Sequence, residues 1–558
     1  MLFGEEILCS VKMKKHSSGA LSKEERKEQD RIYAEGHEYD YVIIGTGSVA
    51  LTVGALLAHS GKKICMLEAH DCPGGYAHTF KRGDYSFCAQ VHYIWGCGKG
   101  GKIYEFLKKI GLEKDITFNL YDPEGYDQMV LPDGKKVGLG YGYDRVIENI
   151  EKVYPGQAGK VRKFCGILAR MRKELRKLPD KVNWWEYIYR WPMFLGLLQY
   201  KNKTLQNVFD ECRLSKEAQL VLCGEIGDVG VPPKDLSFLA YVGLFCGYNL
   251  GAYYPNKHYS YYIERLAKSI TDHEGCHIYY ETEVSGIDVE DGRVCGVKTK
   301  DKIFHADRYI CNMDPRRAGE MIGLEKFPSS FRKKLSYSYS PAGFMIYLGL
   351  KKGFDLKKYG FGKHNTWHFL QWDMNQMWKE CLEGNFEKSL MFMSTPTLHS
   401  SFPGIAPKGA HILELATFTN YSLFAEAQKK GYGEYVRLKN KIAGKMLDLV
   451  EKHYIPDLRK HISVKVVGSP MTCEDFVMAP FGNAYGSLMT PKQTINRVGA
   501  QSPFKNFYWC NASSGYPGIY GTVHTGASLY MDLTKDYYYQ SVSDEESLGM
   551  LRSGFQDR

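Results

Sequence analysis

The sequence lacks the features that mark several large classes of protein. It has no run of about 18 apolar residues, so we expect no membrane-spanning helix. Its 15 cysteines include no C-x-x-C pair, which argues against a zinc knuckle or a thioredoxin-type dithiol. We expect the cysteines in apolar strands, such as Cys65 and Cys311, to be free, buried thiols in a reducing compartment.

Long charged runs are also missing. The net charge of +10 is spread thinly, so we expect no nucleic-acid partner and only mild attraction to anionic membrane surfaces. Residues 1–36 lack the apolar core and the small-residue cleavage site of a secretory signal, so secretion is not expected. We interpret them as a polar arm with a solvated helix at 21–33.

What is present is the composition of a large globular protein. A chain of 558 residues, 44% apolar and 24% charged, allows roughly two to four domains. The aromatic share of 14%, with 41 tyrosines, suggests large apolar pockets or a surface that contacts lipid.

A β-α-β unit near the N-terminus carries the strongest local motif. Residues 39–44 read as a strand buried on both faces, 48–60 as a helix and 63–68 as a second strand. The turn between strand and helix reads Gly45-Thr46-Gly47-Ser48-Val49-Ala50. This is the position that the dinucleotide-binding fingerprint requires, although a purely structural glycine-rich turn is the alternative.

Each fingerprint position has a physical role in that interpretation. Gly45 permits the tight turn, Gly47 lets the backbone approach a pyrophosphate, and Ala50 allows close helix–strand packing. The phosphates would lie at the N-terminus of the helix that begins at Ser48. Glu68 ends the second strand at the distance expected of an acid that binds ribose hydroxyls.

Later segments extend this unit into a discontinuous domain. We expect a helix at 262–271, a β-hairpin at 283–299, a strand ending near 311, a strand at 507–510 and a helix at 518–529. The predicted dinucleotide domain comprises 37–125, 255–325 and 461–540. The blocks 126–254 and 326–460, rich in aromatic residues and helical pattern, would form a substrate- and membrane-facing domain, and 541–558 a C-terminal tail.

The stretch after Glu68 resembles a known family. The segment PGGYAHTFKRGDYSFCAQVHYIWG (73–96) is similar to the stretch that wraps FAD in the phytoene-desaturase, carotenoid-isomerase and retinol-saturase superfamily. The matching residues are Gly74, Gly75, His78, Thr79, Phe80, Gly83, Tyr85, Phe87, His92, Tyr93 and Ile94. Further similar segments follow in order at 224–238, 251–255, 283–297, 312–315 and 474–486, and they favour the retinol-saturase and carotenoid-isomerase branch over monoamine oxidases.

The resemblance implies a fold, a cofactor and further site residues. The fold would be α/β: a Rossmann-type FAD-binding domain, like that of glutathione reductase, interleaved with a mixed α+β substrate domain. Val284 would hold the adenine through its backbone, and Asn511 would take the place of an acid that binds the ribityl chain. The helix that begins near Gly518 and Ile519 would point its N-terminus at the flavin ring. With one fingerprint present, NAD(P)H as reductant would have to dock transiently.

The chain departs from the family pattern in three segments near the expected flavin ring. Cys88 and Gln90 replace an acid and a glycine, His258 and Tyr259 replace a glycine pair, and Cys510-Asn511 replaces Gly-Asp. Larger side chains at glycine positions should narrow or reshape the pocket. We therefore expect either an altered substrate or altered catalysis.

The resemblance also implies the reaction. It is redox or isomerisation chemistry on a carbon–carbon double bond of an apolar polyene or isoprenoid, with retinol saturation as the nearest analogue. Carotenoid isomerisation or desaturation is the alternative, and a flavin-binding protein with lost or altered catalysis is the alternative of another class. His92, Tyr93, His258 and Tyr259 are the candidate catalytic residues, although no acid–base pair is evident.

One segment suggests contact with a membrane. Residues 184–198 are crowded with tryptophan, tyrosine and leucine, and lysines and arginines flank them from Lys173 to Lys203. Aromatic residues favour the headgroup level and lysines attract anionic lipid, although a core helix is an equal alternative. The expected location is peripheral, on the cytoplasmic side of a membrane or at the endoplasmic reticulum; the oligomeric state stays open.

Overall fold

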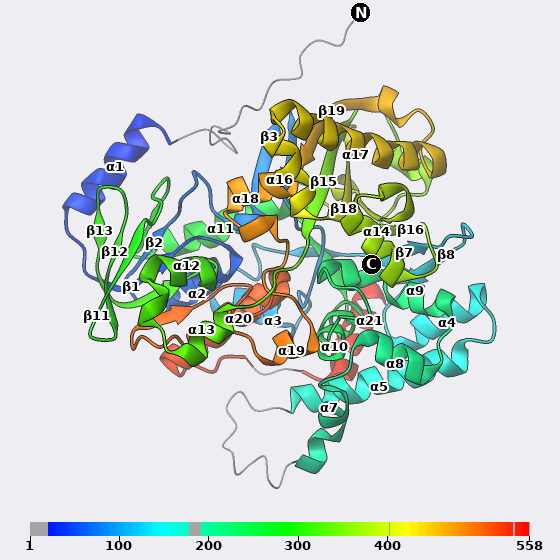
Figure 1. Cartoon of the computed structure of the whole chain (residues 1–558), viewed down its shortest axis with the longest axis horizontal. Coiled ribbons are helices and arrows are strands. Elements are labelled where there is room, and N and C mark those ends of the chain that lie inside the picture. The colour runs from blue at the N-terminus through cyan, green and yellow to red at the C-terminus, as the bar shows by residue number, and fades with distance from the viewer. Residues whose placement is uncertain (1–20, 178–190, 401, 540–541, 557–558) are drawn as a thin grey trace, which may run out of the picture.

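The computed structural model describes residues 21–177, 191–400, 402–539 and 542–556. It divides into a Rossmann-type region, a large second sheet and a helical region below that sheet (Figure 1). The helix α1 (Lys23–Ala34) precedes the first region and contains no buried residue, as expected for a solvated arm.

The first region is built on a five-stranded sheet with the order β10-β2-β1-β14-β20. All of its neighbouring strands are parallel. The central strands are almost fully buried, which explains their near-continuous apolar sequence. The strands are β1 (Tyr39–Ile44), β2 (Ile64–Leu67), β10 (His277–Tyr279), β14 (Ala306–Cys311) and β20 (Phe507–Trp509).

Alternate residues of this sheet pack against different layers. Tyr41 and Ile43 lie in the core formed with the helices α2 (Ser48–His59), α11 (His258–Thr271) and α20 (Gly518–Thr534). Val42 and Ile44 face the small sheet of β11 (Gly286–Glu290), β12 (Arg293–Lys298) and β13 (Ile303–Phe304). The predicted hairpin is therefore confirmed, and it covers the face opposite the helices.

The second region is a seven-stranded sheet, ordered β19-β15-β18-β17-β16-β7-β8. Even-numbered residues of β15, such as Phe344 and Ile346, pack under the helices α16 and α17. The odd-numbered Gly343 and Met345 face an internal cavity instead. The elements are β7 (Asp127–Val130), β8 (Lys136–Leu139), β15 (Ala342–Leu350), β16 (Asn365–Phe369), β17 (Leu390–Ser394), β18 (His411–Thr419), β19 (Ile462–Gly468), α16 (Tyr421–Lys429) and α17 (Tyr432–His453).

The position of β19 corrects one predicted boundary. Residues 462–468 were assigned to the dinucleotide domain, but β19 pairs antiparallel with β15 at the edge of the large sheet. The chain therefore returns to the Rossmann-type region only after this strand. The helices of the third region lie beneath the sheet and are α4 (Tyr143–Val153), α5 (Ala158–Arg176), α7 (Leu195–Tyr200), α8 (Leu205–Cys212), α9 (Lys216–Leu222) and α10 (Phe238–Tyr248).

Shorter elements join these regions. A strand pair follows the first β-α-β unit, and a three-stranded sheet, β5-β9-β6, combines two strands that precede β7 with one that follows α10. These and the remaining elements are β3 (Thr79–Arg82), β4 (Tyr85–Cys88), β5 (Ile94–Trp95), β6 (Phe118–Leu120), β9 (Ala252–Pro255), α3 (Lys102–Lys109), α12 (Pro315–Ile322), α13 (Ser329–Leu335), α14 (Met374–Glu383), α15 (Pro396–His399), α18 (Pro470–Val477), α19 (Pro491–Ile495) and α21 (Asp544–Gln556).

Candidate active site

A cavity of about 290 Å³ lies at the carboxyl ends of β1 and β2, where a Rossmann-type sheet binds its ligand. All but Ala50 and Thr79 of the predicted cofactor-binding residues line it. They are Gly45, Gly47, Ser48, Glu68, Gly74, Gly75, His78, Val284, Asn511, Gly518 and Ile519. Segments far apart in the sequence thus meet in one place, as the resemblance implied.

Glycines shape the floor of this cavity. Gly45 has φ of +91°, a left-handed conformation that most side chains disfavour. The loop at Gly74 packs against the fingerprint turn, and its N–H donates to the carbonyl of Thr46 at 2.9 Å. A Cβ atom on Gly47 would lie 2.5 Å from Oδ1 of Asn312, which accepts a hydrogen bond from the Gly47 N–H. A side chain at Gly47 would therefore displace the Asn312 amide from its hydrogen bonds with Gly47 and Cys510.

Two helix N-termini point at the cavity without a side-chain cap. The N-cap residues are Gly47 for α2 and Pro517 for α20, and neither can supply a capping side chain. The two helices are linked there by a 3.0 Å hydrogen bond from the Thr522 hydroxyl to that of Ser48. Free N–H groups and two positive dipole ends are a fitting environment for phosphates and for an electron-rich ring.

Glu68 is held in place at the end of β2. Its carboxylate accepts hydrogen bonds from the N–H groups of Thr46, at 2.8 Å, and His70, at 2.9 Å. The remaining lone pairs of a carboxylate can accept from hydroxyl groups. The uncapped helices, the glycine floor and this acid together fit a dinucleotide.

Two predicted residues line neither cavity, and a third lines the dinucleotide cavity while also holding its own turn. Ala50 is fully buried within α2 and serves helix packing. Thr79 begins β3 and lines neither of the two cavities described here. Asn511 lines the cavity, but its side-chain amide already donates to the carbonyl of Asn312 and accepts from the N–H of Ser513. Binding of the ribityl chain by Asn511 therefore stays a prediction.

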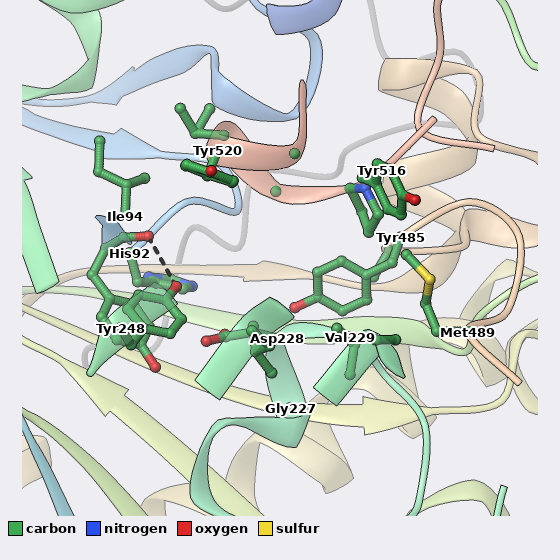
Figure 2. Close-up of a pocket in the computed structure, with 18 of the residues that line it drawn as sticks. His92, Ile94, Gly227, Asp228, Val229, Tyr248, Tyr485, Met489, Tyr516 and Tyr520 are labelled. Carbon is green, nitrogen blue, oxygen red and sulfur yellow. Dashed lines mark hydrogen bonds between the residues drawn. The ribbon is translucent and has the colours of Figure 1, made fainter. Parts of the chain in front are cut away.

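A second, larger cavity of about 510 Å³ adjoins the first (Figure 2). It lies between the inner face of the seven-stranded sheet and α10, and most of its lining is apolar or aromatic. The two cavities share the residues Gln90, Val91, Ala484, Tyr485, Pro517, Gly518 and Ile519. A ring bound over the N-terminus of α20 would therefore face both compartments.

The structure separates the four candidate catalytic residues into two pairs. His92 and Tyr93 line the apolar cavity. His258 and Tyr259 line neither cavity and are fully buried at the start of α11, which corrects the expectation that all four lie near the ring. His258 has φ of +67°, in the left-handed region that favours glycine. The glycine at this position in the family is therefore explained by backbone conformation and not by closeness to a ligand.

His92 and Tyr93 are each joined to a buried acid. Nδ1 of His92 lies 2.9 Å from Oε2 of Glu414, which projects from the inner face of β18. The hydroxyl of Tyr93 donates to Oδ2 of Asp127 at 2.8 Å. Burial raises the pKa of Glu414, and its contact with His92 lowers it in part.

Asp127 belongs to a group of three acids that sequence reasoning missed, of which Asp127 and Glu225 are fully buried and Asp228 is partly exposed. We call Asp127, Glu225 and Asp228 the carboxyl cluster. Burial raises the pKa of Asp127 to about 7, and burial followed by repulsion from Asp127 raises that of Asp228 to about 8. Asp228 lines the apolar cavity. Two of these acids stand in the motif at 224–238, which was noted for its resemblance but given no role.

The structure also shows where residues that depart from the family pattern lie. Gln90 lies at the junction of the two cavities, and its amide donates to Sγ of Cys473 at 3.3 Å. A side chain at this junction narrows the passage between compartments, as expected for the loss of a glycine. Cys88 and Cys510 are buried in the core, where burial raises the pKa of each thiol.

An apolar groove adjoins the second cavity from outside. It is lined by Phe194, Leu197 and Leu198 near α7 and by Ile495 at the end of α19, and it shares Leu175 and Leu239 with the apolar cavity. Of the segment predicted to contact a membrane, residues 184–190 and the side chain of Trp191 lie outside the described part. Within the described ranges, no helix has the length and apolar character needed to cross a membrane.

Comparison with known proteins agrees with this architecture. The family described as an NAD(P)-binding Rossmann-like domain matches residues 43–110. Among solved structures, a putrescine oxidase variant superimposes with a TM-score of 0.62 at 12% identity, covering 89% of this chain and 99% of that one. An oxidoreductase from Methanosarcina mazei gives 0.57 at 14% identity, covering 89% and 100%. At such identities these structures establish the fold alone.

Two groups of proteins match the sequence along most of its length. The all-trans-retinol 13,14-reductase of Danio rerio is 23% identical over 553 residues, covering 90% of this chain and 88% of that protein. The chloroplastic prolycopene isomerase of Daucus carota is 24% identical over 545 residues, covering 91% and 83%. The chain is therefore an α/β protein with a Rossmann-like domain, distantly homologous to retinol 13,14-reductases and prolycopene isomerases.

Proposed function

We propose that this protein is an FAD-dependent oxidoreductase that acts on a carbon–carbon double bond of an apolar polyene or isoprenoid. The observation that carries the proposal is that the dinucleotide cavity adjoins a larger apolar cavity and shares lining residues with it. The homology to enzymes named for retinol and prolycopene supports the same class of substrate.

The chain's own residues divide the work of binding. Glu68 would accept from ribose hydroxyls, and the free N–H groups at the N-terminus of α2 would bind the pyrophosphate. The N-terminus of α20 would face the ring. When bound, the flavin supplies hydride or two-electron transfer at its ring. The surrounding protein positions the double bond and excludes water, and the apolar lining suits a long hydrocarbon chain.

Flavin binding is the first test. Purified protein should be yellow and release FAD on denaturation. Gly47→Ala should weaken FAD binding at least tenfold, about 1.4 kcal/mol, because the new Cβ would collide with Asn312 and disturb the turn that meets the phosphates. Gly159→Ala is the control, since its Cβ would meet nothing within 4 Å. Folded, colourless protein that ignores added FAD would refute the cofactor assignment.

Substrate tests separate reduction from its alternatives. The flavin is photoreduced without oxygen and mixed with all-trans-retinol or prolycopene. A product heavier by two hydrogens indicates a saturase, and an unchanged mass with altered double-bond geometry indicates an isomerase. A desaturase would instead need oxidised flavin and yield a lighter product.

A second candidate function is a flavin-binding protein with lost or altered catalysis. Gln90 favours it, because the side chain lies at the junction through which ring and substrate must meet. Photoreduced flavin that neither polyene reoxidises, with both polyenes recovered unchanged in mass and in double-bond geometry, would support this candidate. Gln90→Gly then provides a sharper test, because widening the junction should restore reoxidation if the side chain is the obstacle.

We also propose that the apolar groove meets a membrane. Met193, Leu195, Leu198 and Ile495 are each between 43% and 50% exposed around it. Lys201 is exposed beside them. Lys203 instead forms an ion pair with Glu211, and Arg176 forms one with Asp544. A polyene is nearly insoluble in water, and a groove that shares its walls with the substrate cavity would admit it from lipid.

A further inference from the structure

We propose that the carboxyl group of Asp228 donates a proton to one carbon of the substrate double bond. This inference rests on the proposed function and names the acid that such chemistry needs. Asp228 ends the short 3-10 helix at Gly224–Asp228, and its side chain is directed into the apolar cavity between Tyr248 and Tyr485 (Figure 2).

The backbone before Asp228 is fixed in position. A Cβ atom on Gly227 would lie 2.2 Å from Cη2 of Trp367, so the indole ring packs directly on the glycine. The Nε1–H of the same Trp367 donates to Oδ2 of Asp127 at 3.2 Å. The loop that presents Asp228 is therefore seated on a buried ring that is itself anchored to the carboxyl cluster.

The surroundings keep this acid protonated. Oδ2 of Asp228 is buried without a hydrogen-bond partner among the described residues. The facing groups are Asp127 from β7, Glu225 from the same turn, and the hydroxyls of Tyr93, Tyr248 and Tyr485. Burial first, and then Asp127, raise the pKa of Asp228, while Tyr93 and Tyr248 lower it only in part. None of these groups is a cation, and Arg172, which lines the same cavity, is not among the groups that shift the pKa of Asp228, so the neutral acid persists near pH 7.

The other polar groups of the cavity are less suited to this role. His92 is paired with Glu414, and the Tyr93 hydroxyl already donates to Asp127. Burial also raises the pKa of Tyr93 far above its ordinary value, so this hydroxyl is a poor acid. Asp228 combines a position in the cavity, an unsatisfied oxygen and an available proton.

The same proton transfer from Asp228 serves both reduction and isomerisation. In reduction, the π electrons of the double bond form a C–H bond with the Asp228 proton. The adjacent carbon receives the hydride, and with it two electrons, from the reduced flavin. The carboxylate left behind regains a proton from solvent after product leaves. In isomerisation, the same proton is added and then returned to Asp228, so no electrons are exchanged.

Asp228→Asn tests the proposal in the FAD-loaded enzyme. The variant should bind FAD normally, and its photoreduced flavin should react normally with oxygen. Conversion of all-trans-retinol or prolycopene should fall about 10²- to 10⁴-fold, the usual range for loss of a general acid. The wild-type rate should decline as the pH rises through about 8, and the variant should lose this dependence. Asp235→Asn, which changes an exposed acid nearby, is the matched control.

An infrared titration supplies a readout that needs no turnover. The difference spectrum between wild type and Asp228→Asn should contain a protonated-carboxyl band at pH 7 that disappears toward alkaline pH. If neither polyene reacts with wild type, the proposed function fails while the infrared band still decides the state of Asp228. A carboxyl band already absent at pH 7, or a variant that reacts at the wild-type rate, overturns the proposal.

Discussion

Buried titratable side chains in this protein act on stability in two opposite directions. Burial lowers the pKa of His78, His258 and His368 to about 4, so these rings are neutral in the folded state. Burial raises the pKa of Asp127 to about 7 and contributes most of the rise of Asp228 to about 8. Unfolded histidine titrates near pH 6.5. Between about pH 6.5 and pH 8, the pH dependence of the free energy of unfolding therefore comes chiefly from the buried acids.

This separation predicts the pH dependence of unfolding. Between the ordinary pKa of an aspartate and about 8, folded Asp228 holds a proton that the unfolded chain has released. The free energy of unfolding should therefore fall as the pH rises from about 6.5 to 8, by on the order of 1 kcal/mol for this residue. Asp228→Asn should flatten the dependence in urea unfolding followed by tryptophan fluorescence. An unchanged slope would show that Asp228 is ionised in the folded state.

Single residues were predictable from sequence where backbone conformation dictates the residue type. Gly45 and Gly74 occupy left-handed conformations, so the fingerprint could be read directly. Asp228 could not be read, because its role depends on Tyr93, Asp127 and Tyr248, which come from distant segments. His258 shows the converse: its place opposite a glycine pair of the family suggested a position near the ring, but it lines neither cavity.

At the scale of elements, the contact between α2 and α20 controls the geometry of the cofactor cavity. Both helices begin at that cavity, and they cross closely at Gly526 of α20. A Cβ there would lie 2.8 Å from the carbonyl oxygen of Val49 and 2.9 Å from Cβ of Thr52. Neither contact can be relieved by rotating a side-chain tip, so a larger residue must separate the helices.

Gly526→Val should therefore weaken FAD binding although it lies outside the cavity. We expect a loss of stability of about 1–3 kcal/mol from overpacking, together with a lower FAD affinity. Thermal unfolding with and without FAD measures both. Gly444→Ala in α17 is a helical control, since its Cβ would meet nothing within 4 Å, and it should be neutral or stabilising. Normal affinity in Gly526→Val would mean that the cavity tolerates displacement of the two helices.

The accuracy of element prediction followed the clarity of the local signal. The strand at 39–44 was predicted with the bounds that β1 has, because a buried parallel strand and a glycine turn mark its ends. The block 326–460 was described by its helical pattern, yet it supplies most of the seven-stranded sheet. Every residue of β15 is buried, and so long an apolar run lacks the alternation that distinguishes a strand from a buried helix.

The whole molecule encloses the apolar cavity by bringing three regions together. The inner sheet face contributes Met345 and Phe392, α10 contributes Tyr248, and the Rossmann-type region contributes the N-terminus of α20. None of these regions alone would form the enclosure. Sequence order predicted that insertions cover the dinucleotide domain, but it gave no register for the edge strand β19, so that domain boundary was misplaced.

The same arrangement predicts how the whole molecule meets lipid. Leu195, Leu198 and Ile495 are exposed beside the groove that adjoins the substrate cavity, and burial of half-exposed leucine or isoleucine in lipid should contribute about 1 kcal/mol each. Nearby lysines such as Lys201 add attraction to anionic headgroups. The protein should therefore float with liposomes, more strongly with anionic lipid and less strongly in high salt.

Leu195, Leu198 and Ile495 should be changed together to Ser. The affinity for liposomes measured by flotation should fall about a hundredfold or more, because the three losses of lipid-burial free energy add to about 3 kcal/mol. Ile303→Ser is the control, because Ile303 is 43% exposed but lies on the hairpin region of the molecule. FAD content should be unchanged in both variants. The triple variant should also take up retinol more slowly from liposomes than from detergent, because only the first route uses the groove. Flotation that survives the triple change would place the membrane contact on another surface and remove the groove as the route of entry.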